Sequence, residues 1–181
     1  MKLLNKTAVI IGGSQGFGFS LASSLKQEGC NVVIASKTKS RLDKAEGQLN
    51  ALAIVVDARK EEDLDAVATT TINTYGSIDI WVNCAGVFKL FPNPEPIDMD
   101  RAHELFDVNF FGSVLGTKVA LNKMHDGIVI NILSSAALDA TRAIKAELYA
   151  ASKWALRGYI DAIRHSNTTN NKILSVYPGG M

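Results

Sequence analysis

Short apolar runs alternate with helical patterns along most of the chain. The apolar runs are continuous, as is typical of strands that helices cover on both faces of a parallel sheet. They span residues 7–12, 31–36, 52–56, 78–84, 128–133 and 173–177. Helical patterns separate them, at residues 16–28, 40–49, 61–75, 98–123 and 147–165. This alternation predicts an α/β fold, a doubly wound parallel sheet of about six strands with helices on both faces.

One segment interrupts the alternation, after the fourth expected strand. Residues 88–96 hold three of the four prolines, Pro92, Pro94 and Pro96. Because proline blocks a helix, we expect an extended loop there. Loops that follow the carboxyl ends of parallel strands border the ligand crevice of an open sheet. This loop would give the crevice an apolar lip, made by Phe88, Leu90 and Phe91.

Composition narrows the class of protein. With 181 residues, 47% of them apolar and 20% charged, the chain is expected to form a single domain over residues 1–181. Its formal charge of +1 gives no sign of a nucleic-acid or membrane partner. The sequence has no membrane-length apolar run, no signal-peptide pattern and only two cysteines, Cys30 and Cys84, which we expect to be reduced and buried. These features favour a cytoplasmic setting. No metal site is expected, because ligand spacing is lacking among the three histidines, His103, His125 and His165.

A glycine-rich turn joins the first expected strand to the first helix, in the segment Ile11-Gly12-Gly13-Ser14-Gln15-Gly16-Phe17-Gly18. Gly12 permits the tight turn, Gly16 lets the backbone approach a pyrophosphate, and Gly18 allows the helix to pack closely on the strand. The helix N-terminus adds free N–H groups and a partial positive charge for phosphates. A tight connection without a ligand is the alternative, but the position at the first strand-to-helix turn favours nucleotide binding.

An acid/base pair is predicted near the other end of the chain. Tyr149 and Lys153 lie four residues apart in Tyr-Ala-Ala-Ser-Lys, so on a helix they share one face. At about 4 Å and an effective dielectric near 20, the ammonium favours the phenolate by about 4 kcal/mol. Such a tyrosine suits general acid/base chemistry. A solvated helix face is the alternative, and the pair points to catalysis because the glycine turn accompanies it.

The spacing Gly-x-x-x-Gly-x-Gly resembles the fingerprint of the short-chain dehydrogenase/reductase family, whose fold is Rossmann-like, with Ile11 in the usual threonine position. Asn83-Cys84-Ala85-Gly86 is similar to the family's Asn-Asn-Ala-Gly, with Cys84 replacing the second asparagine. Further matches follow in the family's order: Asn109 in Asp-Val-Asn-Phe-Phe-Gly, Ser134 after Ile-Asn-Ile-Leu, Tyr149 and Lys153 in Tyr-x-x-x-Lys, and Pro178-Gly179 after the sixth strand.

The resemblance implies an oxidoreductase that interconverts a carbonyl and an alcohol of a small molecule by hydride transfer. Tyr149 would be the acid/base and Ser134 would hydrogen-bond the reacting oxygen. Lys153 would tune Tyr149 and hold the nicotinamide ribose, while Asn109 would anchor a water that relays protons. Ser135 is an alternative to Ser134, because the stretch from there to Tyr149 is longer than is usual in the family. The implied cofactor-binding residues are Gly12, Ser14, Gln15, Gly16, Phe17, Gly18, Ser36, Lys37, Asp57, Ala58, Asn83, Ala85, Gly86, Tyr149, Lys153, Pro178 and Gly179.

The end of the second expected strand bears on the choice of cofactor. An acidic residue there would hydrogen-bond the adenosine ribose and favour NAD. Ser36 takes that place and Lys37 follows it, with Lys39 and Arg41 nearby. These cations suit a 2′-phosphate, so NADP is expected ahead of NAD; the alternative is that they only solvate a turn. Asp57, after the third strand, is similar to the family's adenine-contacting acid.

The resemblance also raises two expectations about assembly and activity. The chain ends at Met181, where members of the family usually continue with a threonine-bearing loop, substrate-covering helices and a seventh strand. A catalytically weak or inactive nucleotide-binding protein, or a dimeric scaffold, is therefore an alternative function. The family's usual contact implies a homo-oligomer, a dimer or tetramer, through residues 98–123 and 147–165. Bulky residues there are candidates for that contact or for the core: Phe106, Phe110, Phe111, Trp154 and Tyr159.

Overall fold

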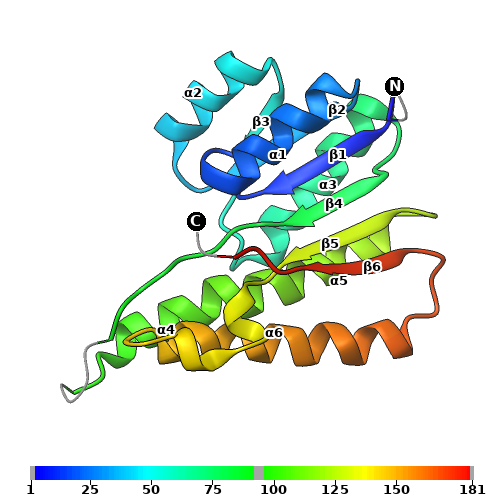
Figure 1. The fold of residues 1–181 in the computed structure, drawn as a ribbon. Coiled ribbons are helices and arrows are strands. Elements are labelled where there is room, and N and C mark those ends of the chain that lie inside the picture. The colour runs from blue at the N-terminus through cyan, green and yellow to red at the C-terminus, as the bar shows by residue number, and fades with distance from the viewer. Residues whose placement is uncertain (1–2, 92–95, 180–181) are drawn as a thin grey trace.

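A parallel sheet organises the chain in the computed structural model, which describes residues 3–91 and 96–179 (Figure 1). Within these residues six strands pair in the order β3-β2-β1-β4-β5-β6. The fold class predicted from the apolar runs is therefore confirmed. The strands are β1 (Thr7–Ile11), β2 (Asn31–Ser36), β3 (Leu52–Val55), β4 (Ile80–Asn83), β5 (Ile128–Ile132) and β6 (Lys172–Val176).

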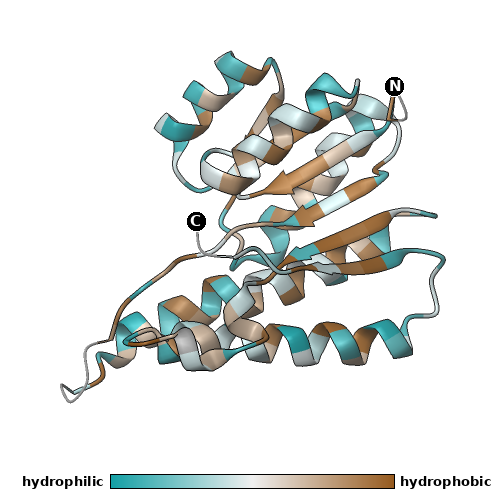
Figure 2. Ribbon diagram, viewed as in Figure 1, coloured by the Kyte–Doolittle hydropathy of each residue, from teal (hydrophilic) through white to brown (hydrophobic). Residues whose placement is uncertain are grey.

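Helices cover both faces of the sheet. On one face, apolar side chains of α1 (Gly16–Gln27) and α2 (Lys39–Leu49) pack on β1, β2 and β4. On the other face, α3 (Glu61–Tyr75) and α5 (Gly112–Lys123) pack on the opposite sides of the same strands, and α6 (Glu147–Ser166) packs on β6. Figure 2 shows that the strands are mostly hydrophobic, while the helices carry both hydrophobic and hydrophilic residues.

The long helical stretch expected over residues 98–123 is helical but not uniform. It consists of α4 (Met99–Phe106), a π-helical turn (Asp107–Phe111) and α5. The Asp98 carboxylate starts it by accepting a hydrogen bond from the Arg101 N–H at 3.1 Å. A π turn inserts an extra residue into an α-helix, and such turns are frequent at functional sites. Here the turn contains Asn109, whose side chain is fully buried.

The turn after β1 explains why this strand ends at Ile11 rather than at Gly12. Gly12 has a φ of +91°, and a Cβ at this position would lie 2.5 Å from the Ala85 backbone nitrogen. A glycine is therefore required where the β1–α1 turn approaches the end of β4. The bounds 31–36 and 61–75 match the sequence predictions, and the other element bounds differ from them by one or two residues, which is the usual scatter at frayed ends.

Two further features frame the site. Residues 88–91 form no helix or strand and Pro96 is exposed, as predicted for the proline-rich loop, whereas Pro92 and Pro94 lie outside the described residues. At the other side of the sheet β6 is an edge strand, with Leu174 and Val176 exposed. Across residues 3–91 and 96–179, no helix combines the length and apolar character that crossing a bilayer requires.

Candidate functional site

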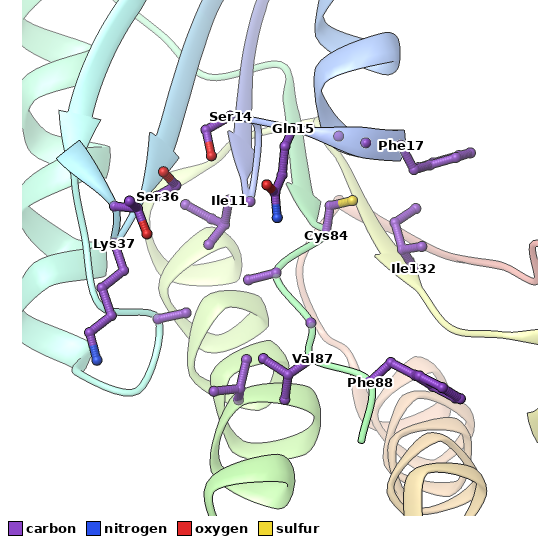
Figure 3. Close-up of a pocket in the computed structure, with 18 of the residues that line it drawn as sticks. Ile11, Ser14, Gln15, Phe17, Ser36, Lys37, Cys84, Val87, Phe88 and Ile132 are labelled. Atoms are coloured by element: carbon purple, nitrogen blue, oxygen red, sulfur yellow. The ribbon is translucent and has the colours of Figure 1, made fainter. Parts of the chain in front are cut away.

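A cavity of about 490 Å³ opens at the carboxyl ends of the strands (Figure 3). Ser36 and Lys37 lie at one side of it, Phe88 lies at the other, and Gln15 and Cys84 lie between them. Most predicted site residues line this cavity, although they come from distant parts of the sequence. They are Gly12, Ser14, Gln15, Gly16, Phe17, Gly18, Ser36, Lys37, Asp57, Ala58, Ala85, Gly86, Ser134, Tyr149, Lys153, Pro178 and Gly179.

The glycine turn leaves room for a ligand above α1. Gly16 has a φ of +55°, and a Cβ there would meet no heavy atom within 4 Å, whereas a Cβ on Gly18 would lie 2.3 Å from the Gly12 carbonyl oxygen. Gln15 precedes α1 in an extended conformation, and its side chain makes no capping hydrogen bond. The first turn of α1 also carries no acidic residue. The helix N-terminus thus presents unsatisfied N–H groups to the cavity, which suits a phosphate.

The end of β2 offers a hydroxyl and cations. The Ser36 hydroxyl oxygen is buried and lacks a hydrogen-bond partner among the described residues. A buried polar atom without a partner is rare in a folded protein, and a bound ligand can supply that partner. Lys37 and Arg41 line the cavity beside it and are exposed.

Asp57, at the end of β3, is held by two cations. Arg59 binds its carboxylate through Nε at 2.9 Å and through Nη2, and the Lys37 ammonium lies 3.3 Å from Oδ2. The Arg59 guanidinium beside Asp57 holds the pKa of that carboxyl well below its usual range. Sequence reasoning missed Arg59, which also lines the cavity. Its spacing in Asp57-Ala58-Arg59, which allows a local ion pair, is the signal that could have found it.

Asn83 lies beneath the cavity and does not line it. Its Oδ1 accepts a hydrogen bond from Trp81 Nε1 at 2.8 Å, and its Nδ2 donates to Asn131 Oδ1 at 2.9 Å and to Thr117 Oγ1 at 3.1 Å. Asn131 is the register partner of Asn83 on β5, so both side chains lie on the same face of the sheet. Asn83 thus joins β4 to β5 and α5 through a buried polar network.

Lys153 and Tyr149 come together on α6, as their spacing predicts. Lys153 is 5% exposed, and its Nζ donates to the Ile132 carbonyl oxygen at 3.0 Å. Burial lowers the pKa of Lys153 to about 8. Its Nζ lies 5.9 Å from the centre of the Tyr149 ring. Tyr149 is half-buried, and its ring meets the Phe88 ring edge-on at 5.0 Å.

The two candidate serines differ in their position. Ser134 follows β5, lines the cavity, and accepts a hydrogen bond from the Ala136 N–H at 3.2 Å through its hydroxyl. Ser135 is exposed and does not line the cavity, and its N–H donates to the Pro178 carbonyl oxygen at 2.8 Å. Of the two serines, only Ser134 therefore shares the cavity with Tyr149 and Lys153.

Asn109 does not line the cavity either, but it fixes one of the cavity walls. Its Nδ2 donates to the Val87 carbonyl oxygen at 2.9 Å, while its Oδ1 accepts from the Val87 N–H at 2.8 Å. The same Nδ2 lies 3.3 Å from the Ser152 hydroxyl, one residue before Lys153. Asn109 thus ties the π turn to the segment after β4 and to α6.

The two cysteines are both free thiols, and they differ in burial. Cys30 is buried as expected, but Cys84 is only half-buried, because it faces the cavity. Loss of hydration on burial raises the pKa of the Cys84 thiol to about 11, so the thiol stays protonated near neutral pH. Among the described residues no three His, Cys, Asp or Glu side chains gather in a way that would hold a metal ion.

The arrangement fits an extended dinucleotide. Phosphates can lie at the free N–H groups of α1, adenosine can lie toward Ser36 and Lys37, and a reactive group can lie toward Tyr149, Ser134 and Lys153. The orphaned Ser36 hydroxyl and the open space beside Gly16 support this fit. A proton donor and a hydrogen-bonding hydroxyl at the far end from the cations can act on an oxygen atom of a substrate.

Comparisons with known proteins agree with this geometry. A family model described as short chain dehydrogenase matches residues 6–181. An uncharacterised oxidoreductase of Bacillus subtilis is 33% identical over 172 residues, which are 90% of this chain and 48% of that protein. An uncharacterised oxidoreductase of Staphylococcus saprophyticus is 30% identical over 189 residues, covering 99% of this chain and 80% of that protein. The chain therefore spans about half the length of the first relative and about four fifths of the second.

A solved structure supports the fold in particular. An alcohol dehydrogenase from the archaeon Thermococcus sibiricus, complexed with 5-hydroxy-NADP, superimposes with a TM-score of 0.87 at 23% sequence identity. The match covers 97% of this chain and 77% of that chain. The likeness confirms the doubly wound arrangement of the sheet and its helices.

Proposed function

The chain belongs to the short-chain dehydrogenase family, and from this premise we propose that it is an NADP(H)-dependent oxidoreductase that interconverts a carbonyl and an alcohol. The observation that carries the proposal is the shared cavity. Tyr149, Lys153 and Ser134 line one end of it, while the glycine turn and Lys37 line the rest. These residues are scattered along the sequence, and only the carboxyl edge of the sheet brings them together.

NADP is preferred to NAD on the chemistry at the end of β2. Ser36 presents a hydroxyl where an acid would favour NAD, and Lys37, Arg41 and Arg59 supply cations for a 2′-phosphate. The solved neighbour from Thermococcus sibiricus binds an NADP derivative, which fits this choice. The free N–H groups of α1 would hold the pyrophosphate. When bound, NADPH supplies the hydride that the carbonyl carbon accepts.

Side chains at the α6 end of the cavity transfer the proton and stabilise the charges that develop. Tyr149 gives its phenolic proton to the carbonyl oxygen during reduction and takes it back from the alcohol in the reverse direction. Ser134 donates a hydrogen bond to the same oxygen, where negative charge develops. The Lys153 ammonium stabilises the phenolate that Tyr149 becomes, and it would hold the nicotinamide ribose. Asn109 holds the wall at Val87. The family resemblance implies that it would also anchor a water that relays protons.

A homo-oligomer and a cytoplasmic location complete the proposal. Of the five aromatic candidates for a contact between copies, Phe111 and Trp154 are exposed on the π turn and α6, at 51% and 42%. Phe106, Phe110 and Tyr159 are half-buried against the protein's own core. Exposed aromatic side chains on neighbouring helices suit a contact between two copies. Free cysteines fit a reducing compartment.

Titration with NADPH and NADH, followed by nicotinamide fluorescence, tests the cofactor site. We expect micromolar affinity for NADPH. NADH should bind about tenfold more weakly, a difference of about 1.4 kcal/mol in binding free energy, because it lacks the 2′-phosphate. Consumption of NADPH with a panel of ketones and aldehydes then tests turnover. Binding without turnover would identify a nucleotide-binding module instead of an enzyme. Binding of neither cofactor would favour a scaffold.

A further inference from the structure

The segment that follows β4 is anchored by backbone hydrogen bonds at two residues, Val87 and Phe91. At Val87 the Asn109 amide binds the backbone N–H and carbonyl together, at 2.8 and 2.9 Å. At Phe91 the backbone N–H donates to the Lys145 carbonyl oxygen at 2.7 Å, and the ring is buried against α4. The second bond ties this segment to the loop that precedes α6. The exposed residues between the two ends are therefore held in place by the fold.

The exposed side chains Phe88 and Leu90 are apolar, and Phe88 lies beside Tyr149, the proposed proton donor. Phe88 is 62% exposed although its ring contacts Tyr149, and Leu90 is 47% exposed. Ile144, next to the Lys145 carbonyl that binds Phe91, is 77% exposed. Phe91, which the sequence predicted to share an apolar lip with Phe88 and Leu90, is instead buried, so we use the name apolar lip for Phe88, Leu90 and Ile144. Phe88 lines the cavity, and Leu90 and Ile144 stand on the two segments that the bond between Phe91 and Lys145 joins. Single exposed apolar residues are ordinary, but a group of them on tethered loops next to a cavity marks a ligand surface.

The charged residues that line the cavity near Phe88 are ion-paired or buried, and the others lie at the opposite end of the cavity. Lys89 lies between Phe88 and Leu90, but it is ion-paired with Glu104 of α4 and its side chain is only 19% exposed. The charged residues that line the cavity in the described chain are Glu104, the partner of Lys89, the buried Lys153, and a group at the ends of β2 and β3, namely Lys37, Arg41, Asp57 and Arg59. Beside Phe88 the described lining of the cavity offers a charged group of a substrate no unpaired counter-ion, whereas an apolar group would find surface to bury.

We propose that the substrate is a neutral ketone or aldehyde whose carbonyl carries an aromatic or branched aliphatic group, and that Phe88, Leu90 and Ile144 bind this group. This inference rests on the proposed function. The reacting oxygen lies between Tyr149 and Ser134, and the apolar substituent extends past the Phe88 ring. Phe88 acts as a specificity residue, and its contact with Tyr149 also orients the phenol.

Three ketones of graded polarity test the proposal on the intact chain with NADPH: acetophenone, its charged relative 4-acetylbenzoate, and dihydroxyacetone. We expect kcat/KM for acetophenone to exceed that for either of the others by about tenfold or more, the range that a hydrophobic pocket provides. Phe88→Ala should lower kcat/KM for acetophenone by about tenfold and bring the ratio to 4-acetylbenzoate toward one. Phe88→Leu should restore most of the preference. Leu4→Ala, an exposed apolar residue before β1, is the matched control and should change nothing.

Binding of the same ketones to the complex with NADP⁺, measured by saturation-transfer NMR, separates the two proposals. If acetophenone binds in a manner that depends on Phe88 but none of the ketones is reduced, the substrate surface stands and the proposed reaction falls. If 4-acetylbenzoate or dihydroxyacetone is the better substrate, the reaction stands and the apolar lip is wrong. Absence of binding by every ketone overturns the inference, as does a lip covered by a second copy, which Phe88-dependent self-association would reveal.

Discussion

The two ends of the cavity hold their charges in opposite ways. At the ends of β2 and β3, Lys37 and Arg59 share the Asp57 carboxylate at the protein surface, where the Lys37 side chain is 66% exposed. At the α6 end, Lys153 is buried and hydrogen-bonds to a backbone carbonyl. Burial disfavours the charged form of Lys153 and so lowers its pKa. The exposed Lys37 remains in contact with water.

The difference assigns separate tasks to the two ends. The exposed Lys37 forms an ion pair worth only up to about 1 kcal/mol, so Lys37 can exchange Asp57 for a phosphate at little cost. A buried ammonium is firmly placed and has an altered proton affinity, which suits a group that controls the protonation of its neighbour. We therefore propose that the first end selects the cofactor and that the second performs the chemistry. Four substitutions test this division, in order of decreasing effect.

Tyr149→Phe removes the proton donor while it keeps the ring against Phe88. We expect turnover of any ketone substrate to fall by about 10²–10⁴-fold, the usual contribution of a general acid/base. NADPH affinity should change by less than about twofold, since the adenosine end is untouched. Steady-state kinetics and fluorescence titration measure the two quantities. A variant that keeps more than about a tenth of the activity would show that another group moves the proton.

Lys153→Met should change how stability depends on pH. Burial gives Lys153 a pKa of about 8 in the folded chain, against an ordinary value of 10.5. The unfolded chain therefore binds the proton more tightly between these pH values, so the free energy of unfolding of the wild type rises with pH over this window. Each pH unit is worth about 1.4 kcal/mol, so we expect a rise of about 3 kcal/mol relative to the variant. Urea unfolding without cofactor, from pH 7 to 10.5, measures it; parallel curves would contradict the burial of a charged lysine.

Ser36→Asp places a carboxylate where the structure has an orphaned hydroxyl. We expect NADPH affinity to fall by about tenfold, because like charges oppose each other, and NADH affinity to rise, because a ribose hydroxyl gains an acceptor. Ser36→Ala is the control and should alter neither affinity by more than about threefold. Unchanged preference in the aspartate variant would mean that the adenosine lies elsewhere.

Asp57→Asn should change cofactor affinity least, but it should separate the effect on NADPH from the effect on NADH. It releases Lys37 and Arg59, so NADPH affinity should rise by about three- to fivefold, in line with the strength of a surface pair. Because the pKa of the Asp57 carboxyl is held well below its usual range, the effect should be constant from pH 5 to pH 8. NADH affinity is the control. If both affinities fall instead, Asp57 contacts the adenine, as the family resemblance implies.

The fold could be predicted because continuous apolar runs have few other uses in a chain of ordinary composition. The strand 31–36 was predicted in full, since helices cover both of its faces. The helical pattern over 98–123 was also correct, but periodicity cannot separate a π turn from the α-helix on either side of it. That distinction depends on Asn109 and its hydrogen bonds to Val87, which link residues far apart in the sequence.

The candidate site could be predicted where a motif fixes the backbone conformation, and less well where it depends on the orientation of a side chain. Gly12 and Gly18 have their positions because any Cβ would collide with the backbone. Asn83 belongs to a matching motif, yet its side chain turns into the network with Asn131 beneath the cavity. Arg59 was not predicted, because its pairing with Asp57 depends on the conformation of the turn that contains both residues.

The clamps at Val87 and Phe91 have a practical consequence for engineering. Each is a backbone anchor, so the identity of the three residues between them is not needed to keep the segment in place. Residues 88–90 therefore form an exchangeable cassette at the mouth of the cavity. A small library confined to these three positions should redirect selectivity among carbonyl compounds while it leaves the cofactor end and the core of the sheet intact.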